Sequence, residues 1–163
     1  MSAFDTLPRR VAIAVVTFLA APAALAADAS VAITGQVQHP TTLTATDLEK
    51  LPAASVAISL GTGPQSAKYT GALLWTVLSN AGPIDAPGKN AKLRHTYLIT
   101  AGDGYAVSLS EGEIDPDFEG KSVLLAYAKD GKPIDPADGI RLIVPGDHKG
   151  GRAVRGVVKI DVQ

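Results

Sequence analysis

The sequence contains no cysteine, and this absence limits the folds and metal sites that are open to the chain. Disulfide-stapled folds are excluded, so packing and hydrogen bonds must hold the domain together. A structural zinc site is also disfavoured, because the remaining candidate ligands, His39, His95 and His148, are scattered and form no closely spaced pair. A chain of 163 residues is nevertheless long enough for one domain with its own hydrophobic core.

The first 26 residues have the pattern of an export signal. Arg9 and Arg10 give a positively charged start, residues 11–20 form an apolar run too short to span a bilayer, and Ala-Leu-Ala at 24–26 matches a cleavage site. We therefore expect a periplasmic mature chain that begins at Ala27, rather than a membrane anchor. The arginine pair leaves twin-arginine export open, but the usual Phe-Leu does not follow it, which favours an ordinary Sec signal.

Alternating apolar and polar residues predict a strand-dominated domain with a few short helices. Residues 46–49 fit a capping box and should open a helix that Pro52 closes. Residues 72–81 have helical spacing, with Gly82 as the natural end. The predicted strands lie at 31–37, 55–60, 96–100, 105–109, 122–128, 141–144 and 154–162. Because strands and helices do not alternate regularly, we expect an α+β fold with mixed or antiparallel sheets.

Several short motifs stand in a fixed order along the middle and the end of the chain. They read Tyr69-Thr-Gly71 before a Leu-Leu-Trp helix start, Ala101-Gly-Asp-Gly-Tyr105, Leu124-Leu-Ala-Tyr127, Arg141-Leu-Ile-Val-Pro-Gly146 and Arg152-Ala-Val-Arg155. In this order they resemble the molybdopterin-binding domain of the sulfite oxidase family. The resemblance implies that residues 27–163 form such a domain. It also implies that the protein is a molybdopterin-dependent oxidoreductase or a subunit of one, with a redox or membrane partner protein.

The chain departs from this family at the metal ligand. Catalytic members place a cysteine in the loop after the second strand, where this chain reads Ser59-Leu-Gly-Thr-Gly-Pro-Gln-Ser66. The hydroxyl groups of Ser59, Thr62 and Ser66 are hard, normally protonated donors and replace a thiolate poorly. The family's tryptophan after the closing basic residue is also absent, because Gly156 stands there. A second function therefore stays open, a non-catalytic module that binds an anionic small molecule or a partner protein.

Residues 141–159 carry five basic side chains and one acid, together with glycines that let backbone amides approach a ligand. In the related family this region helps to hold the pterin phosphate and oxyanion substrates. The resemblance therefore makes Lys149, Gly150, Arg152 and Arg155 the candidate binding residues for an anionic small molecule or a pterin phosphate. The alternative interpretation is a solvated turn whose basic residues face acids elsewhere in the chain.

Five acidic residues alternate with other residues between positions 111 and 119. The run lacks the residue order of a calcium loop, so we expect a solvated edge that balances the basic region. The formal net charge of −1 and the few aromatic residues give no reason to expect a nucleic-acid partner. Trp75, on the second predicted helix, is expected to be a core residue.

Overall fold

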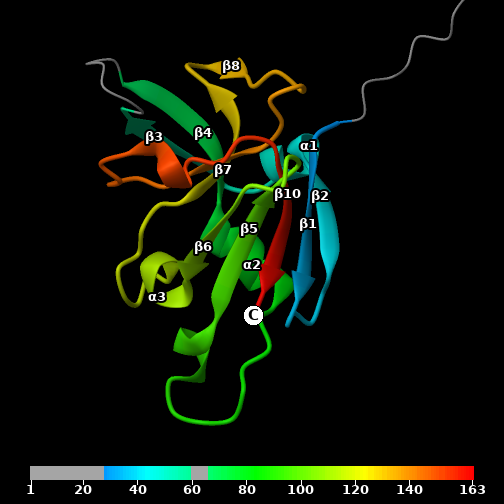
Figure 1. Ribbon diagram of the computed structural model, residues 1–163, viewed down its shortest axis with the longest axis vertical. Coiled ribbons are helices and arrows are strands. Elements are labelled where there is room, and N and C mark those ends of the chain that lie inside the picture. Colours follow the sequence, from blue (N-terminus) through cyan, green and yellow to red (C-terminus); the bar gives the residue numbers. More distant parts are fainter. Residues whose placement is uncertain (1–27, 60–65) are drawn as a thin grey trace, which may run out of the picture.

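The computed structural model describes residues 28–59 and 66–163, which form two five-stranded sheets (Figure 1). The first sheet has the order β2 (Thr41–Thr44), β1 (Ser30–Gly35), β10 (Val157–Val162), β5 (Thr96–Ala101) and β6 (Ala106–Ser110). β1 and β10 run parallel, while the other pairs in this sheet are antiparallel. The first and last described strands therefore lie side by side in the middle of one sheet.

The second sheet is antiparallel throughout. Its order is β3 (Ala53–Ile58), β4 (Ala67–Leu73), β7 (Leu124–Lys129) and β8 (Lys132–Pro133), and β9 (Arg141–Ile143) also pairs with β7. The register between β4 and β7 shifts between Thr70 and Gly71, so a bulge interrupts the ladder there. These two sheets confirm the predicted strand-dominated α+β fold with mixed pairing.

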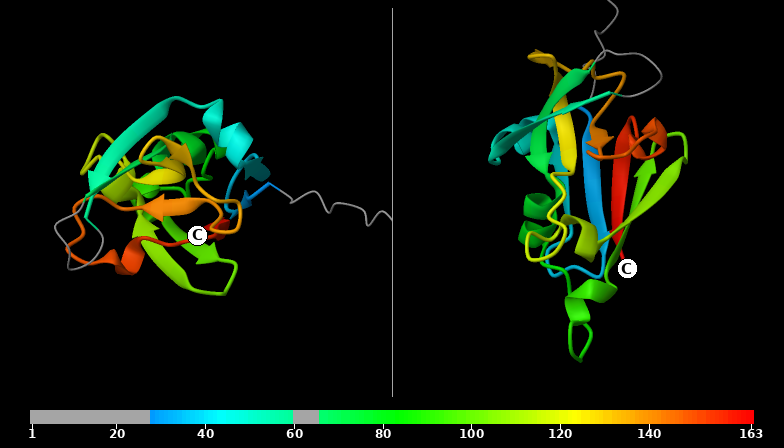
Figure 2. Two further views of the ribbon diagram at one scale, coloured as in Figure 1. Left: turned by 90° about the horizontal axis from the view of Figure 1, so that it is seen from above. Right: turned by 90° about the vertical axis from the view of Figure 1, so that its left-hand side faces the viewer.

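The helices are short and lie between strands in the chain order. They are α1 (Ala45–Glu49), α2 (Leu74–Ala81) and α3 (Glu111–Ile114), together with the 3₁₀ turns η1 (Ala91–Arg94) and η2 (Gly150–Arg152). The main hydrophobic cluster draws buried residues from both sheets and from α2, so the core lies between the layers that face one another in Figure 2. Trp75 is half-buried and packs against this core, as expected. None of the helices in residues 28–59 and 66–163 combines the length and apolar character needed to cross a bilayer.

The boundaries of two helices differ from the sequence expectation for identifiable reasons. The capping box of α1 is formed by Thr44 and Asp47, two residues earlier than expected, because the Asp47 carboxylate returns to the backbone N–H of Thr44. α2 begins two residues late, because residues 67–73 extend as β4 before the chain turns into the helix. Its end is as expected, since Gly82 adopts a left-handed φ of 65° and donates to the carbonyls of Leu78 and Ser79.

The acidic run of residues 111–119 is not the solvated edge that its composition predicts. Glu111 and Asp115 have relative exposures of 3% and 1%. The run begins with α3, whose single turn directs Glu111 and Ile114 into the protein. The edge interpretation is therefore wrong for Glu111 and Asp115, and it holds for Asp117 and Glu119, which are exposed.

Candidate anion-binding site

The four predicted binding residues lie on the connection between β9 and β10, which we call the closing loop (residues 144–156). Lys149 precedes η2 and is exposed, Gly150 and Arg152 lie within η2, and Arg155 follows it. Two hydrogen bonds fix the loop to the β5–β6 hairpin. The Tyr105 hydroxyl donates to the Gly151 carbonyl at 2.7 Å, and the Gly102 amide donates to the Gly156 carbonyl at 2.9 Å.

Arg152 points at acids of its own protein. Its Nε and Nη2 donate to the two carboxylate oxygens of Asp147 at 2.9 and 2.6 Å, and Nη1 donates to Oε1 of Glu113 at 2.8 Å. This fork lowers the pKa of Asp147 and raises that of Arg152. For Arg152, the geometry corresponds to the alternative in which basic residues of the turn face acids elsewhere.

A basic cavity lies beside the closing loop, at the ends of β4, β7 and β9. Two adjoining hollows of about 250 and 280 Å³ share Tyr69, Lys129, Arg141 and Arg155 in their linings. The guanidinium of Arg141 lies over the Tyr69 ring, with its central carbon 5.3 Å from the ring centroid. A guanidinium over an aromatic ring is favoured electrostatically and is restricted in its orientation.

Arg141 carries the most specific signal in this cavity. Its Nε is buried and has no hydrogen-bond partner within the part of the chain that the structure describes. Burial lowers the pKa of Arg141, and the nearby charge of Arg155 acts in the same direction, while Tyr69 and Asp138 oppose this shift. A buried donor without a partner costs about 1–3 kcal/mol, and an anion that accepted its hydrogen bond would remove this cost.

The cations of the cavity form no close ion pair with a carboxylate of the described residues. Among residues 28–59 and 66–163, no carboxylate lies within 4.0 Å of a charged nitrogen of Lys129, Arg141 or Arg155. Three acids also line the two hollows, Asp130 in the first and Asp135 and Asp138 in the second. One oxygen of Asp130 accepts a hydrogen bond from the backbone amide of Lys68 at 2.9 Å, and one oxygen of Asp135 accepts from the backbone amide of Ala137 at 2.9 Å. The linings therefore carry a net positive charge, with three cations against Asp130 in the first hollow and against Asp135 and Asp138 in the second. One of these cations, Arg141, is partly desolvated, and this combination favours an anion.

Arg155 links this cavity to a second, more open hollow of about 290 Å³ along η2. Gly150 and Gly151 line that hollow together with Tyr105 and Asp103. Of the four predicted residues, the structure thus brings Gly150 and Arg155 to cavities, directs Arg152 to acids and leaves Lys149 exposed outside these linings. Tyr69, Lys129 and Arg141 were not among the predicted binding residues, although two of them belong to the motifs that carry the family resemblance.

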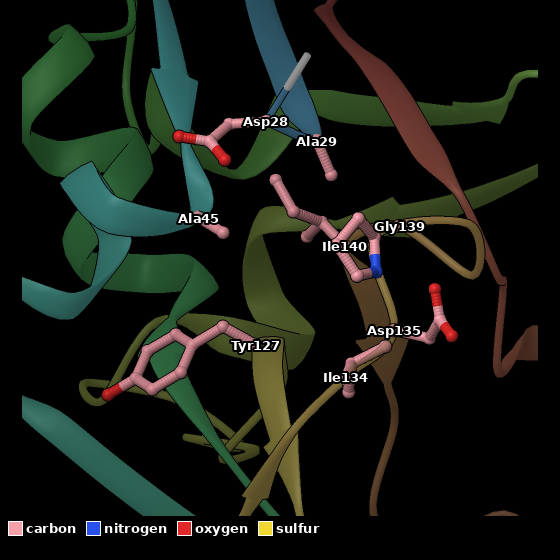
Figure 3. A pocket seen from close by; sticks show the side chains of 9 residues that line it. Asp28, Ala29, Ala45, Tyr127, Ile134, Asp135, Gly139 and Ile140 are labelled. Carbon is pink, nitrogen blue, oxygen red and sulfur yellow. The ribbon is translucent and has the colours of Figure 1, made fainter. Parts of the chain in front are cut away.

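Another cavity differs in both size and charge. It has a volume of about 50 Å³, and Figure 3 shows Asp28 and Ala29 ahead of β1, Ala45 of α1, and Ile140 among its lining residues. Asp28 and Asp135 place two carboxylates there and Tyr127 adds a phenol, while no cation belongs to the lining. This space has room for a few water molecules and is unsuited to an anion.

The residues of the basic cavity fit the anionic groups of a molybdopterin cofactor and do not fit its metal. The orphaned Nε of Arg141, together with Arg155 and Lys129, suits the anionic groups of such a molecule. The metal is different, because the whole sequence lacks a thiolate donor. Ser66 lines the first hollow and Ser59 follows β3, and both are exposed residues with hard hydroxyl donors. Thr62 lies outside the described residues. Within the described residues, no group of three or more histidine, aspartate or glutamate side chains is arranged to hold a metal ion.

A fold comparison with solved structures gives a clear neighbour. The chain is similar to the sulfane dehydrogenase SoxCD from Paracoccus pantotrophus, with a TM-score of 0.62 and 22% sequence identity. The similarity covers 84% of this chain and 38% of the SoxCD chain, so this chain spans well under half of that protein's length. At this level of identity the comparison establishes a shared fold.

Sequence comparisons give the family. A search of curated proteins gives no match. Residues 19–163, by contrast, match the profile of the oxidoreductase molybdopterin-binding domain, which spans the motifs described above and both sheets. The chain therefore belongs to the oxidoreductase molybdopterin-binding domain family.

Proposed function

We propose that this protein is an exported member of its family that binds an anionic ligand, the phosphate of a molybdopterin or a similar small oxyanion, in the basic cavity. The observation that carries the proposal is the buried, unpartnered Nε of Arg141 next to Arg155. Arg141 is half-buried, and its buried Nε donor has given up water without gaining a hydrogen bond, which is costly in a protein interior.

Each residue of the cavity has a distinct part in this binding. Tyr69 holds Arg141 by stacking, so that Arg141 can donate to the ligand without first being ordered. Arg155 adds a second guanidinium from the closing loop, and Lys129 adds an ammonium group from β7. Of the predicted residues, Gly150 provides close backbone approach in the hollow along η2, and Lys149 contributes charge at longer range.

The oxidoreductase activity of the family requires more than this binding. A molybdenum cofactor supplies two-electron redox chemistry when it is bound, and this chain would hold it through the anionic pterin portion alone. Turnover would also need a redox or membrane partner protein to exchange electrons. We therefore favour the second candidate function for the chain by itself, a non-catalytic anion-binding module, on the observation that no cysteine can ligate the metal.

Equilibrium binding of inorganic phosphate and sulfate, measured by calorimetry, tests the proposal. Arg141→Met keeps the apolar stem over Tyr69 and removes the charge. Since a charge-assisted hydrogen bond contributes about 1.5–3 kcal/mol, the variant should bind about 10- to 100-fold more weakly. Lys50→Ala removes an exposed cation that pairs with Asp47 on α1, and it should leave the affinity unchanged. The proposal would be contradicted if Arg141→Met bound phosphate and sulfate as tightly as the wild-type protein does.

Export is proposed on the sequence of residues 1–26, which lie outside the described residues. Arg9, Arg10, the apolar run and the Ala-Leu-Ala site support a periplasmic protein that begins at Ala27. N-terminal sequencing of protein recovered from the periplasmic fraction tests this directly. Recovery of a chain that retains Met1 in the membrane fraction would overturn it.

A further inference from the structure

We propose that Arg152 is a positioning residue that latches the closing loop to α3, and that it does not contact the bound anion. The inference rests on the proposed function, because the loop it positions carries Arg155 into the basic cavity. It reverses the role that the family resemblance gives to Arg152, which is direct contact with the pterin phosphate.

The guanidinium of Arg152 donates all of its observed hydrogen bonds to two carboxylates, those of Asp147 and Glu113. The bidentate contact with Asp147 closes a short ring within the loop, and the contact with Glu113 ties that ring to α3, far away in the sequence. A planar guanidinium satisfies a bidentate and a monodentate carboxylate from fixed directions, so the contacts define both the position and the tilt of the loop.

Glu113 is itself firmly placed, which makes it a suitable anchor. Its Oε2 accepts the backbone N–H of Ser110 at 3.0 Å and completes the capping box of α3. Its Oε1 accepts Nη1 of Arg152 at 2.8 Å, with the ammonium group of Lys121 at 3.7 Å. One carboxylate therefore both starts the helix and holds the loop, so that the loop takes its position from the helix.

The local charge argues against an anion at Arg152. Burial opposes the ionisation of Glu113, but hydrogen bonds from Arg152 and Ser110 outweigh it, and the pKa of Glu113 is lowered. The pKa of Asp147 is lowered too, mainly by Arg152. Both carboxylates are therefore charged at neutral pH, and two negative charges surround one guanidinium. An incoming anion would have to displace a bidentate carboxylate and approach a second one.

Arg152 of the latch and Arg155 of the anion site are only three positions apart in the loop. Arg155 lines the basic cavity and the hollow along η2, whereas Arg152 lines neither. The Tyr105–Gly151 hydrogen bond secures the η2 turn, which ends at Arg152. Opening the latch would leave the loop held mainly on the hairpin side, and Arg155 would lose its fixed direction into the cavity.

Glu113→Gln distinguishes the two possible roles of Arg152, because they predict opposite changes in phosphate affinity. Glutamine keeps the capping box, because its side-chain oxygen still reaches the Ser110 amide. If Arg152 contacted the anion, removing a competing acid would strengthen phosphate binding. If Arg152 is a latch, the loss of one charged contact should weaken phosphate binding about fivefold. Glu119→Gln is the matched control, since it removes the same charge from an exposed acid that pairs with Lys121 and does not touch Arg152.

Amide hydrogen exchange of the closing loop gives a readout that does not depend on a ligand. We expect Glu113→Gln and Arg152→Lys to speed exchange across residues 150–156, because lysine keeps the charge but cannot form the fork. Glu119→Gln and Arg155→Ala should leave exchange there unchanged. Tighter phosphate binding in Glu113→Gln, or unchanged loop exchange in that variant, would overturn the latch. If the wild-type protein did not bind phosphate, the proposed function would be overturned. The hydrogen-exchange test would then decide by itself whether Arg152 holds the closing loop to α3.

Discussion

The Tyr97 hydroxyl, on β5, donates a hydrogen bond to the carboxyl group of Glu111 at the start of α3, and both side chains are buried. Burial raises the pKa of Glu111 from an ordinary 4.5 to about 7, and the neighbouring carboxylate of Asp115 adds to the rise. The protein therefore holds a carboxyl group that takes up a proton near neutral pH, at the junction between the first sheet and α3.

The other charged groups around Glu111 set the size of this effect. His95 and Lys92 favour the ionised carboxylate, whereas Asp85 disfavours it. His95 is buried, and its Nε2 lies 2.9 Å from Oδ1 of Asp85, so this pair partly cancels at the position of Glu111. Burial and Asp115 thus dominate, and the net direction is upward.

Stability should fall as the pH rises through this range. The unfolded chain loses the Glu111 proton near pH 4.5, while the folded protein keeps it until about pH 7. The stabilisation associated with the protonated group is complete below pH 4.5 and lost above pH 7, and its size is about 1–3 kcal/mol. Urea unfolding between pH 5 and 8 measures it.

Glu111→Gln mimics the protonated group and should remove this pH dependence. The variant should be more stable than wild type at pH 8 and similar at pH 5. Glu49→Gln, in which an exposed acid of α1 is neutralised, should leave the slope unchanged. A wild-type unfolding free energy that is flat or rises between pH 5 and 7 would show that Glu111 titrates normally.

Lys92 pairs with one buried and one exposed acid, and we predict that the two pairs differ in their contribution. Its ammonium group lies 2.7 Å from Asp115 and 2.9 Å from Asp117, whose side chains are 1% and 77% exposed. Asp115→Asn should lower the unfolding free energy by about 1–3 kcal/mol, because it leaves a buried polar group in a site shaped for a charge. Asp117→Asn should change it by less than about 1 kcal/mol. Equal losses in chemical denaturation would contradict the burial argument.

The strands were largely predictable, because alternation and turn residues are local signals. The strands predicted at 96–100 and 105–109 do form an antiparallel pair, and the helix end predicted at Gly82 followed from glycine chemistry. β4 was missed, because Tyr69-Thr-Gly71 was assigned to the approach of the following helix. The burial of Glu111 was also unpredictable, since it depends on Tyr97 and on the pairing of β5 with β6 rather than on the neighbouring sequence.

The candidate site shows the same division between local and distant signals. Glycines and cations identified the closing loop, and Gly150 and Arg155 do line cavities. The sequence could not reveal that Arg141 stacks on Tyr69, because the two residues meet only through the pairing of β9 and β4 with β7. The contact of Arg152 with Glu113 on α3 was also unpredictable, because these residues are 39 positions apart in the sequence.

Gly71 should not tolerate a side chain. A Cβ atom there would lie 2.2 Å from the carbonyl oxygen of Leu125 and 2.6 Å from the Cα of Ala126, both on the backbone of β7. Gly71→Ala should therefore force β4 and β7 apart and destabilise the protein by about 1–3 kcal/mol. In contrast, Gly112→Ala in α3 meets only Leu93 at 3.8 Å and should be neutral or slightly stabilising. Thermal unfolding of both variants checks the prediction, which a stable Gly71→Ala protein would contradict.

The final prediction is that this chain alone does not oxidise sulfite. Catalysis of the family type uses a protein sulfur to fix and tune the metal, and the sequence has no cysteine to supply it. Met1 is the only sulfur-containing residue of the sequence, and it belongs to the expected signal. Protein purified from its native source should contain far less than one molybdenum per chain. It should show no turnover of sulfite, sulfoxide or nitrate with artificial electron carriers, yet the same sample should still bind phosphate through Arg141. Stoichiometric molybdenum with steady turnover, lost in Arg141→Met, would establish instead that the basic cavity supports an active cofactor without a thiolate ligand.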